Sequence, residues 1–148
     1  QLSRQGEPMP LYYKACQESK GNLTCWKRVD DNGFCVGCNR TVRHELKMNL
    51  RCHYSDSQDS NWIGTFHDPA VSILGMDADD LAEKQAQGGR EAVDTSVMAQ
   101  YYARPWQLMV RAKRDADRIT VGVMDACPVD LPERGRDLLQ EVREMLAD

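Results

Sequence analysis

The sequence lacks the features that would assign it to a membrane or to a common class of enzyme. No apolar run approaches the roughly 20 residues that a transmembrane helix needs. The polar opening, residues 1–10, has no apolar stretch like that of a signal peptide, and we interpret it as a linker. Gly-rich phosphate loops, Gly-x-Gly-x-x-Gly and His-Glu-x-x-His motifs are all absent. We therefore expect a protein that neither spans a membrane nor catalyses a reaction.

A strong net charge is also absent. The 148 residues carry a formal charge of −4, which argues weakly against a nucleic-acid partner. A local basic face matters more than the total charge, however, and basic residues concentrate in Lys27 to Arg51 and in Arg104 to Arg118. Acidic residues concentrate in Asp77 to Asp94 and near the C-terminal end. Such stretches are more often solvated faces than binding sites.

Cysteine is abundant by comparison, and four of the six cysteines fall in one short polar segment: Cys16, Cys25, Cys35 and Cys38. This segment has almost no apolar residues to order it. The Cys35-x2-Cys38 spacing is typical of half of a zinc site, and the wider spacing from Cys16 to Cys25 leaves room for a loop. Four sulfur ligands fill a tetrahedral site, so we predict one structural Zn²⁺ with no catalytic role. The alternative is two disulfides, or one disulfide and two free thiols.

The other two cysteines, Cys52 and Cys127, lie in apolar strand-like patterns, where a free cysteine acts as a small hydrophobe. Together with the absence of a secretory signal, this favours a reduced, intracellular protein.

Alternation of apolar and polar residues predicts a mainly β fold. The expected strands are Leu11 to Ala15, Arg43 to His53, Asn61 to His67, Trp106 to Arg114 and Ile119 to Cys127. Helices are expected between the third and fourth strands, with Gly75 and the Gly88-Gly89 pair as stops and Asp77 as an N-cap. This order is that of a five-stranded OB-fold barrel. We assign it to residues 11–131, with a zinc ribbon inserted at residues 16–38.

Inward-facing positions are predicted for the last two strands from the same alternation. They are Trp106, Leu108, Val110, Ala112, Ile119, Val121 and Val123.

Two aromatic residues, Trp62 and Phe66, share one face of the third strand, about 13 Å apart at roughly 3.3 Å per residue. If Ile63 and Thr65 face the core, both rings are exposed and can stack on the bases of single-stranded DNA. In the reversed register they are core residues. The predicted outward faces also carry four cations suited to phosphate contacts: Lys47, Arg51, Arg111 and Lys113. These cations favour the binding interpretation.

The C-terminal segment, residues 132–148, is predicted to be an amphipathic helix from about Glu133 to Ala147. Its apolar positions form one stripe: Leu138, Leu139, Val142, Met145 and Leu146. The stripe could pack on the chain's own barrel. Its position after a Pro-bounded exit from the last strand favours a helix-bundle partner instead.

Several of these motifs occur in the order of a known family. Tyr12 to Cys16, Cys25 to Val29, the Cys35/Cys38 pair, Asn61-Trp62 and Gly135-Arg136 resemble the C-terminal domain of the large subunit of replication protein A. The resemblance implies an OB-fold with a zinc ribbon after its first strand and single-stranded DNA binding across the barrel. It also implies a terminal helix that joins helices of two smaller OB-fold subunits in a three-helix bundle. DNA replication and repair in the nucleus would follow.

Two departures from the family pattern leave other functions open. The gap from Cys16 to Cys25 is longer than usual and the gap from Cys25 to Cys35 is shorter, while Lys113 stands where the family often has an aromatic residue. The chain could serve a telomeric or meiotic complex instead. The rival functions are an assembly module with little DNA affinity and a zinc-ribbon protein that binds RNA.

Overall fold

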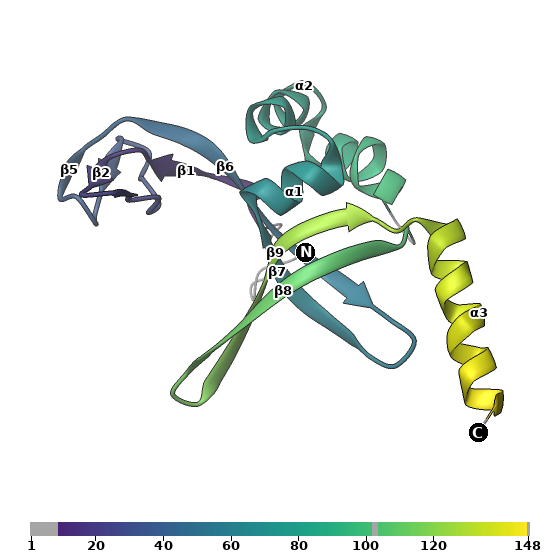
Figure 1. Ribbon diagram of the computed structural model, residues 1–148. Coiled ribbons are helices and arrows are strands. Elements are labelled where there is room, and N and C mark those ends of the chain that lie inside the picture. The colour runs from purple at the N-terminus through teal and green to yellow at the C-terminus, as the bar shows by residue number, and fades with distance from the viewer. Residues whose placement is uncertain (1–8, 102–103, 148) are drawn as a thin grey trace.

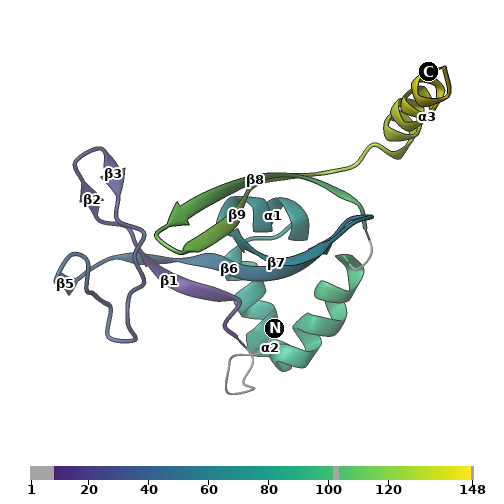
Figure 2. The same ribbon diagram turned by 90° about the horizontal axis from the view of Figure 1, so that it is seen from below.

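The computed structural model describes residues 9–101 and 104–147. Five strands form one sheet in the order β1-β6-β7-β9-β8 (Figures 1 and 2). Their bounds are Tyr12–Cys16 for β1, His44–Ser55 for β6, Ser60–Phe66 for β7, Trp106–Asp115 for β8 and Arg118–Pro128 for β9. All five predicted strands are therefore present, within a few residues of their expected ends.

The sheet is mainly antiparallel. Its single parallel ladder joins β7 to β9 through Gly64↔Gly122 and Thr65↔Val123. No ladder connects β1 with β8 among the described residues, so a closed barrel is not confirmed. The mainly β architecture with a terminal helix is confirmed.

The helices between β7 and β8 begin and end where local chemistry requires. Helix α1, His67–Leu74, is followed by Gly75, whose φ of 64° is the left-handed conformation that glycine adopts without strain. Helix α1 begins at His67, so this residue does not belong to the preceding strand as predicted. Helix α2, Ala78–Ser96, is capped by the Asp77 carboxylate, which accepts from the Asp80 N–H at 2.9 Å. The predicted stop at the glycine pair appears as a break, because Gly89 has a φ of 72°.

Further along, the 3₁₀ helix η1 spans Met98–Tyr101 and the terminal helix α3 spans Leu131–Ala147. No helix in the described part of the chain is long and apolar enough to cross a membrane.

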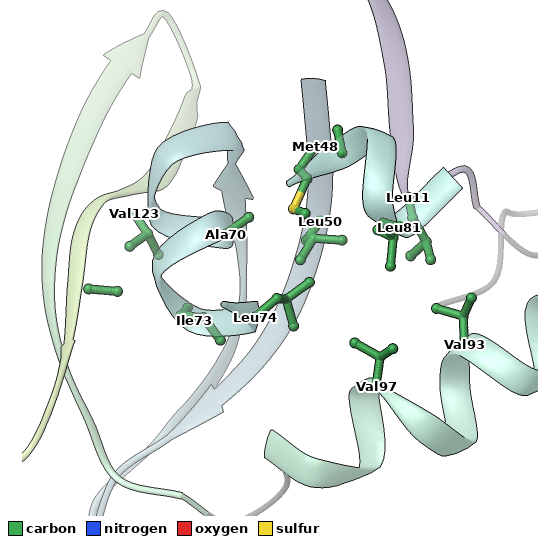
Figure 3. Close-up of a cluster of buried hydrophobic side chains, with 12 residues drawn as sticks. Leu11, Met48, Leu50, Ala70, Ile73, Leu74, Leu81, Val93, Val97 and Val123 are labelled. Atoms are coloured by element: carbon green, nitrogen blue, oxygen red, sulfur yellow. The ribbon is translucent and has the colours of Figure 1, made fainter. Parts of the chain in front are cut away.

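The apolar core lies between one face of the sheet and helices α1 and α2 (Figure 3). Met48 and Leu50 reach it from β6, and Ile73, Leu74 and Leu81 from the helices. The inward direction of Met48 and Leu50 is as their alternation predicts. No helix among the described residues covers the opposite face of β6 and β7 (Figure 2).

The predicted burial of the β8–β9 hairpin is wrong at three positions. Val110 is 50% exposed, Ile119 is 64% exposed, and Ala112 is exposed. A β-bulge between Met109 and Val110 shifts the β8–β9 register, and this end of the hairpin extends past the helices that bury Val123 (Figure 1). Cys127 is also exposed, so it does not act as a buried hydrophobe. Alternation gives the face of a residue but not whether another layer covers it.

Helix α3 extends away from the sheet, and none of its described residues is buried (Figures 1 and 2). It begins two residues earlier than predicted, because Asp130 accepts from the Glu133 N–H at 3.0 Å and Pro132 lies in the first turn. The entire apolar stripe is exposed: Leu138, Leu139, Val142, Met145 and Leu146. In the structure, therefore, this helix does not pack on its own sheet.

Candidate metal centre and nucleic-acid interface

The cysteine segment folds as two small hairpins between β1 and β6. Strands β2 (Ser19–Lys20) and β3 (Leu23–Thr24) form the first, and β4 (Phe34–Cys35) and β5 (Arg40–Thr41) form the second. The second hairpin runs past Cys38 to Thr41. We call residues 16–42 the insert.

Polar contacts join and shape these hairpins. Arg40 pairs with Glu18, and the Lys20 ammonium donates to the Gly37 carbonyl, so each contact crosses from one hairpin to the other. The turn through Asn32 and Gly33 that precedes Cys35 is held by the Asp30 carboxylate, which accepts from the Phe34 N–H at 2.8 Å. The insert thus has few apolar contacts beyond its sulfur cluster.

The four cysteines of the insert converge on one point. All four sulfur atoms lie within 4.8 Å of one another. Cys16 Sγ is 3.6 Å from Cys38 Sγ, and Cys25 Sγ is 3.9 Å from Cys35 Sγ. Tetrahedral Zn²⁺ with bonds of about 2.3 Å separates its sulfurs by roughly 3.8 Å, whereas a disulfide needs about 2.05 Å. All six cysteines are free, so the cluster fits a metal and not the disulfide alternative.

The thiols differ in acidity. Burial and then hydrogen bonds with the other three thiols raise the pKa of Cys38 to about 12. Burial also acts to raise the pKa of Cys35, but hydrogen bonds led by the Cys38 backbone N–H outweigh it and lower that pKa to about 7. Burial raises the pKa of Cys16 as well. Zn²⁺ binds thiolates, so a metal ion would displace the protons of these thiols on binding.

The insert is fastened to the end of β1 by backbone hydrogen bonds. The Cys16 N–H donates to the Lys27 carbonyl at 2.9 Å, and the Val29 N–H donates to the Lys14 carbonyl at 2.8 Å. A bridge between Ala15 and Arg28 completes this pairing. The segment after Cys25 therefore runs beside β1.

The uncovered face of the sheet carries the predicted aromatic residues. Trp62 is 47% exposed and Phe66 is 53% exposed, while Thr65 between them is fully buried. This is the register that leaves both rings available, and the core alternative is wrong. His53, the β6 partner of Trp62, lies against it with ring centroids 5.0 Å apart.

Two predicted arginines lie at the ends of one row across this face. Arg51 pairs with Gly64, Gly64 with Gly122, and Gly122 with Arg111, from β6 through β7 and β9 to β8. Three strand spacings place the arginines about 14 Å apart. The Phe66 ring lies 3.2 Å from the position that a Cβ of Gly64 would take. Two glycines, which have no side chains, thus lie between two exposed arginines and beside the exposed ring of Phe66.

The two predicted lysines are placed differently. Lys47 pairs with Glu45 at 2.6 Å and lies 4.7 Å from the ring centroid of Trp26. That hydrogen bond with Lys47 is the main cause of the lowered pKa of the Glu45 carboxyl. Lys113 lies on the exposed end of the hairpin, 3.3 Å from Asp115. Both lysines are therefore partly neutralised by a neighbouring carboxylate.

One feature of this face was missed from the sequence. A hollow of about 260 Å³ lies between the insert and the sheet, lined by Tyr13, Trp26, Arg28, Asn49 and Phe66. The alternation of β1 does not mark Tyr13 as outward, because its neighbours on the same face of an ideal strand, Leu11 and Ala15, are both apolar and buried. Nothing in the sequence pattern brings Trp26 beside Phe66, because that contact depends on how the insert folds back.

Comparisons with known proteins agree with this architecture. The sequence matches the model of the family "Replication factor-A C terminal domain" over residues 5–138. It is 30% identical to the replication protein A 70 kDa DNA-binding subunit of Xenopus tropicalis, covering 91% of this chain and 23% of that protein. A relative of the same kind from Arabidopsis thaliana is 27% identical, with 89% of this chain and 22% of that protein covered. The chain spans less than a quarter of either relative.

Solved structures show the same fold. A replication protein A heterotrimer bound to ssDNA contains a chain with a TM-score of 0.73 and 25% identity, over 90% of this chain and 31% of that chain. Yeast RPA bound to ssDNA gives a TM-score of 0.68 and 21% identity, over 91% of this chain and 78% of that chain. With a family match that takes in the cysteine cluster, all five strands and the start of α3, the chain belongs to the replication factor-A C-terminal domain family.

Proposed function

We propose that this chain is a non-catalytic OB-fold domain that binds single-stranded DNA across the uncovered face of its sheet. The observation that carries the proposal is the row from Arg51 to Arg111, with Trp62 and Phe66 exposed beside it. Arginines at the two ends of this row, with only glycines between them, can contact successive phosphates while the rings stack on bases. Both relatives described above are named as DNA-binding proteins, which supports the same function.

The four cysteines of the insert would hold one structural Zn²⁺. Four thiolates leave no open coordination position, so the ion would order the insert and take no part in chemistry.

Helix α3 would join helices from two smaller OB-fold subunits in a three-helix bundle. Support comes from its fully exposed apolar stripe and from the likeness to a chain of a replication protein A heterotrimer. A nuclear role in DNA replication and repair follows if the chain acts as part of such a heterotrimer. Service in a telomeric or meiotic complex is the alternative assignment.

The proposal is tested by measuring the affinity of the chain for a labelled single-stranded oligodeoxynucleotide across a series of salt concentrations. Replacing Trp62 and Phe66 together with Ala should weaken binding by about 1–3 kcal/mol per lost base stack. Replacing Arg51 and Arg111 together with Ala should reduce the slope of log K against log salt by about 1.4, from roughly 0.7 per phosphate.

A matched control is Lys84→Ala, which removes an exposed cation from α2, the helix that covers the opposite face of the sheet. It should leave the affinity and the salt slope nearly unchanged. A wild-type chain with no measurable affinity would favour the assembly-module function, which the net charge of −4 also favours. Displacement of the DNA by low concentrations of RNA of the same sequence would instead support an RNA-binding protein.

A further inference from the structure

The hollow beside the insert is built like a ligand site. Two exposed aromatic rings line it from different parts of the chain: Trp26, 43% exposed, from the insert and Phe66 from β7. Tyr13 adds a third ring from β1, and its hydroxyl donates to the Trp26 carbonyl at 3.4 Å. Three rings that converge on an open space, without packing into the core, form a surface suited to a flat ligand.

Trp26 is held in place at a cost in backbone strain. Its φ of 50° is left-handed, a conformation that is rare for a bulky side chain. Its N–H donates to the Cys16 carbonyl at 3.0 Å, and Cys25 precedes it directly. The backbone of Trp26 is therefore anchored beside the sulfur cluster. Strain of this kind persists only where the surroundings impose it, and it is found most often at binding sites.

The charges around the hollow indicate the class of ligand. Arg28 lines it and lies 5.7 Å from the Tyr13 ring centroid, while the Lys47 ammonium lies near the Trp26 ring. Cations beside rings suit an anionic, aromatic molecule. Asn49 supplies the only neutral amide in the lining, a group that can both donate to and accept from the edge of a base.

The size and position of the hollow narrow the ligand further. About 260 Å³ is below the roughly 300–1,000 Å³ of pockets for drug-sized ligands, so it suits one ring system. Phe66 belongs both to this hollow and to the uncovered face, and Asn49 is its partner across the β6–β7 ladder. A strand that crosses the sheet can therefore continue into the hollow without a break.

We propose that the hollow between the insert and the sheet receives one unpaired base of single-stranded DNA, stacked on Trp26, with Arg28 at its phosphate. This proposal rests on the proposed function, and it adds the insert to the DNA-binding surface.

The test compares Trp26→Ala with the wild-type chain in binding to oligodeoxythymidylate. Affinity should fall roughly 5- to 150-fold, the equivalent of one base–aromatic stack, while the salt slope stays the same. Trp26→Phe should recover most of the loss. The control is Leu23→Ala, which removes a 76%-exposed apolar side chain of the same insert that does not line the hollow.

Metal content is measured on each variant. If Trp26→Ala loses the ion, Trp26→Asn replaces it, because asparagine tolerates a left-handed backbone. A direct readout uses Trp62→Phe, in which the remaining exposed tryptophan is Trp26, since Trp106 is largely covered. The oligonucleotide should quench its fluorescence, and adding Trp26→Phe should abolish the quenching.

The outcomes separate the two proposals. Wild-type affinity in Trp26→Ala, with weaker binding in the Trp62/Phe66 double variant, would overturn the base pocket and leave the DNA-binding function intact. Absence of binding by the wild-type chain would overturn both.

Discussion

The insert and the sheet are ordered by different forces, although they are joined in one chain. The sheet and its helices bury a conventional apolar cluster that includes Met48, Leu81 and Val93. The buried apolar cluster of the insert consists of Val29 and two of its own cysteines, with few partly buried apolar side chains around them. Apolar burial scales with area, so such a small cluster cannot offset the conformational entropy of about 27 ordered residues. The proposed metal ion, held by the four sulfur atoms, would supply the stabilisation that burial does not.

This difference also separates what each region presents to a ligand. The sheet offers a face whose rings are placed by strand alternation, which persists whenever the core is folded. The insert offers Trp26, whose placement depends on the cysteine cluster. If the two surfaces act together on DNA, the contacts made by the insert depend on the metal and the contacts made by the sheet do not.

Removing the metal should give the largest effect and should divide the two regions. A strong chelator, or Cys35→Ser, should unfold the insert and leave the sheet folded, since structural zinc supplies about 10–16 kcal/mol of apparent binding free energy. Hydrogen exchange should show lost protection across residues 16–42 and retained protection in β6 and β7. Cys127→Ser is the control, because this exposed cysteine is outside the cluster. Unfolding of the whole chain on chelation would contradict the division.

A core substitution should destabilise the sheet and leave the metal site of the insert intact. Leu81 is fully buried between α2 and the sheet, and Leu81→Ala should lower the free energy of unfolding by about 2–5 kcal/mol. Bound metal should be unchanged under native conditions, because Leu81 lies outside the insert. Urea denaturation and metal analysis measure the two quantities. The matched control, Leu23→Ala, removes the same side chain from an exposed position and should cost under about 0.5 kcal/mol. Equal losses in the two variants would show that the core does not set stability.

The sequence was sufficient for most of the fold because most of it follows local rules. Alternation placed Met48 and Leu50 inward. Gly75 marked the end of α1, and Asp77 marked the start of α2. The cysteine spacing was enough to group the four thiols. Alternation alone does not say which face a helix will cover, so only the neighbouring cations favoured the outward direction of Trp62.

The remaining errors share a cause, which is that they depend on tertiary placement. Val110 and Ile119 lie beyond the helical layer, which the alternation of their strands does not reveal. The hollow arises where two segments meet that are 40 residues apart, at Trp26 and Phe66. Local sequence predicts elements and faces, and it does not predict which faces meet.

Helix α3 provides the smallest expected effect on stability, since neither the core nor the metal holds it. Leu139→Asp with Leu146→Asp should change the unfolding free energy of the isolated chain by under about 0.5 kcal/mol, as expected for exposed positions. The same change should abolish assembly with two smaller subunits, because a bundle would bury both side chains. Gln140→Asp, on the same helix but outside the apolar stripe, is the control for added charge. Co-purification with the partner subunits and urea denaturation give the two readouts. A large loss of stability in the isolated chain would mean that α3 packs on its own sheet in solution, and intact assembly would mean that the subunits meet elsewhere.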